Sequence, residues 1–153
     1  MGIRLTPAEA WNVITASHTG ILTTLRRDGT PVALPVWFVV DHQTIGMMTP
    51  SGTKKVSRIR RDARASFLVE SGLRWEELCA VHLNGSIAVV DDAEAIARIG
   101  AALNDKYAGF RPAASTLPAQ TRGYYADQTY LRFAPEGRVL SWDNARIPLR
   151  NTS

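Results

Sequence analysis

Residues 47–62 read MMTPSGTKKVSRIRRD, and this stretch contains the end of an apolar strand, a turn rich in hydroxyl groups and the start of a basic helix. Thr53 is a favourable helix N-cap, and Val56 and Ile59 lie three residues apart on one face of the helix that follows. Two lysines in the first helical turn oppose the macrodipole, a cost that a bound anion would offset. Hydroxyls, free backbone N–H groups and ammonium groups therefore meet at one point, which favours a phosphate site. The alternative is a solvated basic helix.

The residues before this stretch predict a β-meander. Ile21–Leu25 and Val32–Val40 are rich in β-branched and aromatic residues, and the Asp-Gly pair between them is a strong hairpin signal. A turn at residues 41–43 leads into a third strand, Thr44–Thr49. Because Pro35 cannot donate a hydrogen bond to a sheet ladder, we expect it at a sheet edge or a bulge.

Three helices are expected, and two of them have clear N-terminal signals. The segment Thr6–Glu9 has capping-box spacing with proline at the first helical position, which predicts a helix over Pro7–Ala16. Asp92 is a suitable cap for a second helix, Ala93–Leu103, whose apolar residues have the spacing of a buried face. The third is the basic helix described above, which is expected to end near Arg61.

The second half of the chain predicts four further strands: Ala65–Val69, Cys79–Val90, Gly123–Phe133 and Arg138–Trp142. Gly85 indicates a bulge or a close backbone approach, and residues 135–137 are expected to form a hairpin turn between the last two strands. Glu70–Leu78 is expected to form an insert, and Asn104–Arg122 a long irregular loop. About seven or eight short antiparallel strands with about three helices predict a mainly β (α+β) barrel, built by one domain over residues 1–153.

Composition excludes several classes of protein. The chain has 153 residues, a net charge of +4, 45% hydrophobic and 21% charged residues, close to the globular average. Its longest strongly apolar stretch, residues 32–40, is far shorter than the about 20 residues of a membrane helix. The N-terminus has no secretory signal, so we expect a cytoplasmic protein. Cys79, the single cysteine, is expected at a buried strand position, and no metal site is expected because the three histidines lack partners at ligand spacing.

Five short segments follow one another in a specific order: residues 20–25 (GILTTL), 28–31 (DGTP), 35–38 (PVWF), Thr49 with 53–55 (TKK), and 59–62 (IRRD). In these segments, over about Thr6–Asp91, the chain resembles the pyridoxamine phosphate oxidase-like superfamily of split β-barrels. The resemblance is to its branch of flavin- and deazaflavin-dependent reductases. Two positions depart from the related sequences: Arg58 stands where asparagine is common, and Ala63 where proline is common. Both are expected to lie beyond the phosphate contacts.

The resemblance implies a cofactor site at the interface of a homodimer. The backbone of Pro35, Val36 and Trp37 would lie along the isoalloxazine ring, although Trp37 can also be read as a plain core residue. A partner's C-terminal aromatic residue, Trp142, would complete the pocket. The residues implied to hold the phosphate and the ribityl chain are Thr49, Ser51, Thr53, Lys54 and Lys55, with Arg60 nearby.

The resemblance also implies an oxidoreductase that transfers a hydride between its cofactor and an unidentified small organic substrate. The cofactor is coenzyme F420, a deazaflavin, or alternatively FMN. F420 is favoured because the basic tract, with Arg26 and Arg27, suits a phosphodiester and a carboxylate-bearing tail. If the reaction needs a proton donor, the candidates are Tyr124, Tyr125 and Tyr130 on the last long strand.

Two other classes of function remain open at this point. A non-catalytic protein that binds or sequesters flavin, F420 or haem would fill the space beside the ring with side chains such as Trp75 or Phe110. A nucleic-acid-binding barrel would need exposed aromatic residues interleaved with the basic charges, and the tract Lys54–Arg64 contains none.

Overall fold

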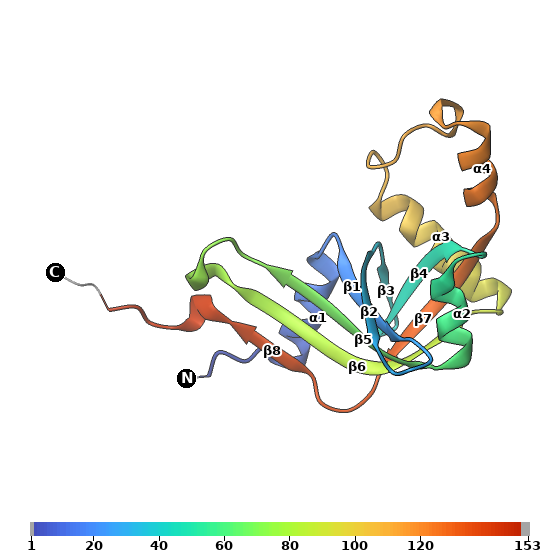
Figure 1. The fold of residues 1–153 in the computed structure, drawn as a ribbon. Coiled ribbons are helices and arrows are strands. Elements are labelled where there is room, and N and C mark those ends of the chain that lie inside the picture. Colours follow the sequence, from blue (N-terminus) through green and yellow to red (C-terminus); the bar gives the residue numbers. More distant parts are fainter. Residues whose placement is uncertain (1, 151–153) are drawn as a thin grey trace.

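A computed structural model of the chain describes residues 2–150, and within them all strands belong to one antiparallel sheet (Figure 1). The sheet has eight strands in the order β2-β1-β5-β6-β7-β4-β3, with β8 paired to β6. The strands are β1 (Gly20–Leu25), β2 (Pro31–Val36), β3 (Val39–Asp41), β4 (Thr44–Pro50), β5 (Arg64–Ser71), β6 (Cys79–Val89), β7 (Gln128–Pro135) and β8 (Leu140–Asp143). The helices are α1 (Pro7–Ala16), α2 (Lys54–Arg61), α3 (Ala93–Lys106) and α4 (Ala119–Ala126).

The connectivity forces this sheet to curl. The two edge strands, β2 and β3, follow one another in the chain, separated only by Trp37 and Phe38. The three steps from Val36 to Val39 span at most about 11 Å, so the two edges of the sheet must come together. The fold is therefore a split β-barrel, as expected, and its seam lies at Trp37 and Phe38.

The seam corrects one predicted strand. Val32–Val40 was expected to be continuous, but β2 ends at Val36, and β3 pairs with β4 instead of β1. The reason is a tertiary contact: the Phe38 backbone N–H donates to the Tyr107 hydroxyl, 2.8 Å away, and not to a strand. Pro35 lies on the edge strand β2, as predicted.

The C-terminal half also differs from the prediction. Gly123–Phe133 was expected to be all strand, but its first residues belong to a fourth helix, α4, and β7 begins at Gln128. The expected loop Asn104–Arg122 contains the end of α3 and the start of α4. The expected hairpin between the last two strands is absent, since β8 pairs with β6. Tyr124 and Tyr125 therefore lie on a helix, and Cys79 at the start of β6 is half-buried instead of buried.

The barrel interior is filled mainly by aromatic and aliphatic side chains. Phe38 packs edge-on against Phe67, with ring centroids 4.9 Å apart, and both are fully buried. Two glycines make this packing possible. A Cβ atom at Gly20 would lie 2.2 Å from the Phe67 ring, and one at Gly85 would lie 2.1 Å from the Ala134 carbonyl oxygen. The close backbone approach predicted at Gly85 is thus confirmed.

Helices α1 and α3 cover the barrel, and each packs on it with the apolar face that its sequence predicts. Thr6 caps α1 in a complete capping box, and Ile14 of this helix is buried in the main core. Asp92 caps α3, whose buried residues Ile99 and Leu103 form a second core against β3 and β4. None of the described helices is both long and apolar enough to cross a membrane.

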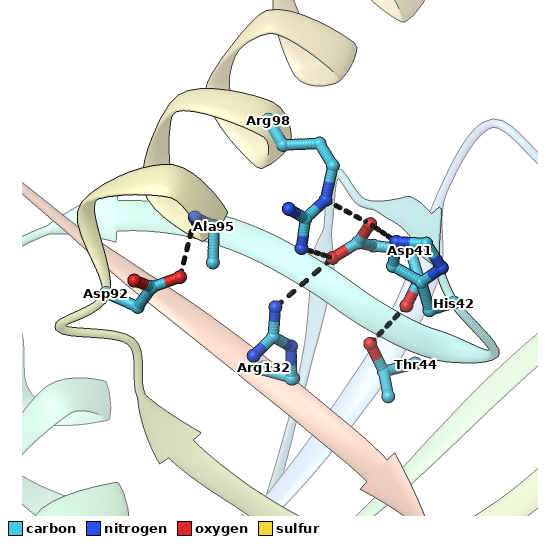
Figure 2. A network of polar contacts seen from close by, with 7 residues as sticks. All are labelled: Asp41, His42, Thr44, Asp92, Ala95, Arg98 and Arg132. Carbon is cyan, nitrogen blue, oxygen red and sulfur yellow. Dashed lines mark hydrogen bonds and ion pairs between the residues drawn. The ribbon is translucent and has the colours of Figure 1, made fainter.

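Buried Asp41, at the end of β3, links helix α3 to the sheet (Figure 2). Its carboxylate accepts two hydrogen bonds from Arg98 of α3, at 2.8 and 3.0 Å, and one from Arg132 of β7, at 3.2 Å. The Arg98 guanidinium, and after it Arg132, hold the pKa of the Asp41 carboxyl below its ordinary value against the opposing effect of burial. Three elements far apart in sequence are thereby joined at one carboxylate.

Two substitutions in the turn between β3 and β4 are expected to raise the stability of the protein. His42 and Gln43 both have positive φ angles, 50° and 58°, which L-residues other than asparagine and glycine adopt at a cost. The double variant His42→Asn/Gln43→Gly is expected to raise the free energy of unfolding by about 0.5 kcal/mol, since Asn-Gly is the preferred pair in such two-residue turns. Urea unfolding of this variant, beside His42→Ala/Gln43→Ala as the control without relief, checks it. A double variant less stable than the parent would contradict the turn assignment.

Candidate functional site

The phosphate site predicted from the sequence lies where β4 ends and α2 begins. Thr53 has extended backbone geometry and caps α2, its hydroxyl accepting from the Val56 N–H at 3.4 Å. The first N–H groups of a helix have no partner within it, and the first turn of α2 contains no acidic residue. This predicted start of α2 is confirmed, and it presents backbone donors beside Lys54 and Lys55.

Four cations, Arg26, Lys55, Arg58 and Arg61, form what we call the basic corner, and Lys55 and Arg58 are its more buried members. Lys55 is half-buried, and its burial, followed by the charge of Arg58, lowers the pKa of its ammonium group. Arg58 is only 9% exposed, and its Nε donates to the Thr24 hydroxyl of β1 at 3.0 Å. Burial, then Arg26 and Arg61, lower the pKa of the Arg58 guanidinium.

No carboxylate within residues 2–150 neutralises this cluster of Arg26, Lys55, Arg58 and Arg61 at ion-pair distance. The nearby Asp62 carboxylate is held by Arg64, at 2.8 Å. Burying unbalanced positive charge is costly, and a bound anion would relieve that cost. Arg58, which was expected from the sequence to lie beyond the phosphate contacts, thus belongs to the basic corner.

An aromatic cluster holds the barrel seam. The Trp37 and Tyr107 rings are stacked, with centroids 4.3 Å apart and planes 3° apart, and His18 contacts both rings edge-on. The Tyr107 hydroxyl donates to the His18 carbonyl oxygen, at 2.7 Å, and accepts from Phe38. Lys106 donates to the Ser17 and Phe38 carbonyl oxygens, and burial lowers the pKa of its ammonium group to about 8. The end of α3 therefore fixes the orientation of Trp37.

A cavity of about 640 Å³ opens beside Trp37. Trp37, Met48 and Pro50 line it from the barrel, and the other wall comes from the segment between α3 and the end of α4, residues 107–126, which we call the cover. In Figure 1 the cover stands out from the barrel at the end that also carries α2. The volume falls within the range of about 300–1,000 Å³ typical of small-molecule sites.

The cavity and the basic corner are neighbours. Pro50 lines the cavity, and only Ser51 and Gly52 separate it from the helix cap Thr53. Ser51 joins this turn to the start of β7: its N–H donates to the Asp127 carbonyl oxygen at 3.0 Å, and its hydroxyl accepts from Thr129 at 2.8 Å. The turn that carries the helix cap is therefore continuous with the cavity wall at Pro50.

The structure brings together some of the predicted site residues and separates others. Trp37 lines the cavity, and Ser51, Thr53, Lys54 and Lys55 form the adjoining corner. Val36 and Thr49 are buried, Thr49 pointing away from the cavity face of Met48 because strand side chains alternate. Pro35 is exposed on the edge strand, where its backbone remains accessible.

Arg60 and Trp142 lie apart from this corner. Arg60 is exposed, and two residues along an α-helix turn it about 200° from Arg58, so the two side chains leave α2 on nearly opposite sides. Trp142 is on β8, which Figure 1 shows at the end of the molecule away from α2 and α4. Within one chain it does not reach the site.

Tyr107 is expected to support the seam through its hydroxyl. Tyr107→Phe leaves the buried Phe38 N–H without its acceptor, so we expect the free energy of unfolding to fall by about 2 kcal/mol. Tyr124→Phe removes the same atom from a half-exposed ring on α4 and should change stability little. Urea unfolding of both variants measures the difference, and equal stabilities would show that the Tyr107 hydroxyl does not hold the seam.

Comparison with known families gives the chain its place. Residues 6–137 match the family model described as pyridoxamine 5′-phosphate oxidase, which covers most of the chain. The chain belongs to the pyridoxamine 5′-phosphate oxidase family. A search of the curated proteins found no match.

Solved structures with the fold of this oxidase family include several similar to this chain. The conserved hypothetical protein Rv2991 from Mycobacterium tuberculosis is 27% identical, with a TM-score of 0.80, covering 99% of this chain and 94% of that one. A structure named F420 reductase is 21% identical, with a TM-score of 0.65 over 88% and 98% of the two chains. The FAD-binding protein from Mycobacterium smegmatis is 22% identical, with a TM-score of 0.63 over 90% and 93%. The last two, at 21% and 22% identity, show that this chain shares their fold.

Proposed function

We propose that this chain is an oxidoreductase that transfers a hydride between a bound F420 or FMN cofactor and a small organic substrate. The observation that carries the proposal is that two unlike places adjoin: an apolar cavity beside Trp37 and a basic corner whose cations make no ion pair within the described residues. A phosphorylated flavin or deazaflavin has the matching halves, a flat ring system and an anionic chain. Family membership and similarity to two solved structures, an F420 reductase and an FAD-binding protein, support this class of cofactor.

The residues present fit such a group. The backbone of Pro35, Val36 and Trp37 offers polar atoms along the seam, where β2 has an unpaired edge. Thr53, Lys54 and Lys55 would hold the phosphate through hydroxyl, backbone N–H and ammonium donors, with Ser51 nearer the cavity. The bound cofactor supplies the hydride chemistry, and the protein supplies orientation and electrostatics.

The side chains around the cavity have supporting roles in this proposal. Met48, Leu103 and Leu117 make its walls apolar, which excludes water from a bound substrate. Of the three tyrosines predicted as proton donors, only Tyr125 lines the cavity. The Tyr130 hydroxyl lies against Gly100 of α3, so Tyr125 is the remaining candidate for proton transfer.

F420 is favoured over FMN within the proposal. The basic corner extends from Lys55 through Arg58 to Arg26 in the turn between β1 and β2. It therefore offers more positive charge than a single phosphate needs, and a cofactor with further anionic groups along its tail would use it. We also propose a homodimer, in which Trp142 of a second copy closes the site that one chain leaves open.

Turnover is the test of this function. Reduced F420 and reduced FMN are each incubated anaerobically with the protein and a panel of quinones and α,β-unsaturated ketones, and at least one of the two should be reoxidised faster with protein than without it. The return of cofactor absorbance gives the rate. Saturable binding of a cofactor without any protein-dependent reoxidation would favour the alternative, a protein that binds or sequesters the cofactor.

A further inference from the structure

The cavity contains one charged side chain among its described lining residues, and the charge is on the cover. The barrel contributes Trp37, Met48 and Pro50, and the cover contributes Pro112, Ala114 and Leu117. Arg111, which also lies on the cover, is the one charged residue among the described lining residues. A single cation in the lining of an otherwise largely apolar cavity favours a bound molecule that carries an anionic group, because the anion gains charge-assisted hydrogen bonds there.

Arg111 has no counter-charge within the described residues. Its Nη1 donates to the neutral Asn104 side-chain oxygen at 3.1 Å, and no carboxylate lies within ion-pair distance. Its guanidinium carbon lies 5.5 Å from the centre of the Trp37 ring. The remaining donors of the guanidinium are thus free to meet an anionic group beside an aromatic surface.

The backbone positions Arg111 for this role. Gly109, with φ +81°, ends the turn that follows α3, and the Phe110 N–H donates to the Tyr107 carbonyl oxygen at 3.1 Å. The Phe110 ring packs on His18, with centroids 4.6 Å apart. Arg111 therefore starts from the anchored end of the cover, next to the aromatic cluster, and not from its far tip.

We infer that this cavity takes a flat, apolar molecule that carries one anionic group, and that Arg111 binds that group. That this molecule is the substrate rests on the proposed function; the binding preference itself does not. Arg111 lines the cavity from the cover, whereas Lys55 lies on α2 and is not among the described lining residues. The ligand class is thus an aromatic or polyene carboxylate, sulfonate or phenolate.

Two dyes with the same body test this inference. 8-Anilinonaphthalene-1-sulfonate carries the anionic group, and N-phenyl-1-naphthylamine lacks it; both fluoresce on entering an apolar site. Arg111→Gln should weaken binding of the sulfonate dye about fivefold, the size expected for a partly exposed charge contact, and change the neutral dye less than twofold. Ala114→Trp, which fills the cavity, should weaken both dyes. Arg122→Gln, on α4 but not among the described lining residues, should weaken neither.

Unchanged affinity of Arg111→Gln for the sulfonate dye would overturn the inference. Equal losses for both dyes, or an equal loss in Arg122→Gln, would do the same, because the effect would then not be specific to the charge of Arg111. Titrating FMN and F420 into the same variants separates the two proposals. If the dyes behave as expected while the parent binds neither cofactor, the ligand class stands and the proposed function falls.

Discussion

Lys55→Ala is expected to weaken binding of FMN or F420 about 10- to 100-fold. The ammonium group is half-buried beside Arg58 at the start of α2, where a phosphate contact is less screened than at an open surface. A hydrogen bond between charged groups contributes about 1.5–3 kcal/mol, and each 1.4 kcal/mol is a tenfold change in affinity. Quenching of ligand fluorescence on titration gives both dissociation constants.

Two controls make the Lys55 result specific. Arg60→Ala removes the same charge from the same helix but on the side away from Arg58, so it should change affinity less than twofold. Stability is the second control: because burial disfavours the charged form of Lys55, its removal should not lower the free energy of unfolding. A Lys55→Ala protein that binds as tightly as the parent would show that the phosphate lies elsewhere.

Asp41→Asn is expected to lower the free energy of unfolding by about 2 kcal/mol. The substitution keeps the size of the side chain but removes the charge that pairs with Arg98 and Arg132 (Figure 2). Breaking a fully buried pair costs about 3–5 kcal/mol, and the smaller value reflects the exposure of the two arginine side chains, 45% and 33%. Urea unfolding followed by tryptophan fluorescence measures the loss.

The effect of Asp41 should depend on pH in one direction. Its folded-state pKa is depressed, so the carboxylate contributes stability that is fully present above the ordinary aspartate pKa, about 3.9 in unfolded chains. The contribution is lost as pH falls through the folded-state pKa. The difference in stability between the parent and Asp41→Asn should therefore be constant from pH 5 to 7 and shrink below about pH 4.

Asp105→Asn is the matched control for this series. Asp105 is exposed near the end of α3 and has no ion pair at a described residue, so its substitution should leave stability and its pH dependence nearly unchanged. If Asp41→Asn is as stable as the parent at pH 7, the carboxylate does not join β3, α3 and β7 in the way that the structure indicates.

Local signals explain which parts of the fold were predicted. The caps at Thr6, Thr53 and Asp92 set the starts of α1, α2 and α3, because each side chain satisfies an N–H within its own first turn. The first hairpin follows from Asp28 and Gly29, where Gly29 has φ +84°. Such features depend on a few neighbouring residues and can be read from the sequence.

Several features that depend on distant contacts were not predicted. The break after Val36 comes from Tyr107, 69 residues from Phe38, and the sequence near the break reads as uninterrupted strand. Helix α4 has no buried residue and no side-chain cap, so its segment lacks both usual helix signals. The pairing of β8 with β6 instead of β7 likewise joins residues far apart in the chain, such as Cys79 and Asp143.

The same distinction applies to the site. Trp37 and Lys55 were predicted as site residues because they lie in short segments that resemble the family pattern. Arg58 and Arg111 were not predicted as site residues, since the features that single them out, burial beside Thr24 and a position on the cavity wall, appear only in the folded chain. The pairing of unbalanced charges with a cavity becomes visible only when the chain is folded.

The most direct test of the account is a paired titration of the purified protein with FMN and with coenzyme F420, following ligand fluorescence. We predict saturable binding of at least one, tighter for F420, and weakened in Lys55→Ala but not in Arg60→Ala. If neither ligand binds, the proposal of a flavin or deazaflavin site is wrong, and the basic corner and the adjoining cavity serve some other ligand.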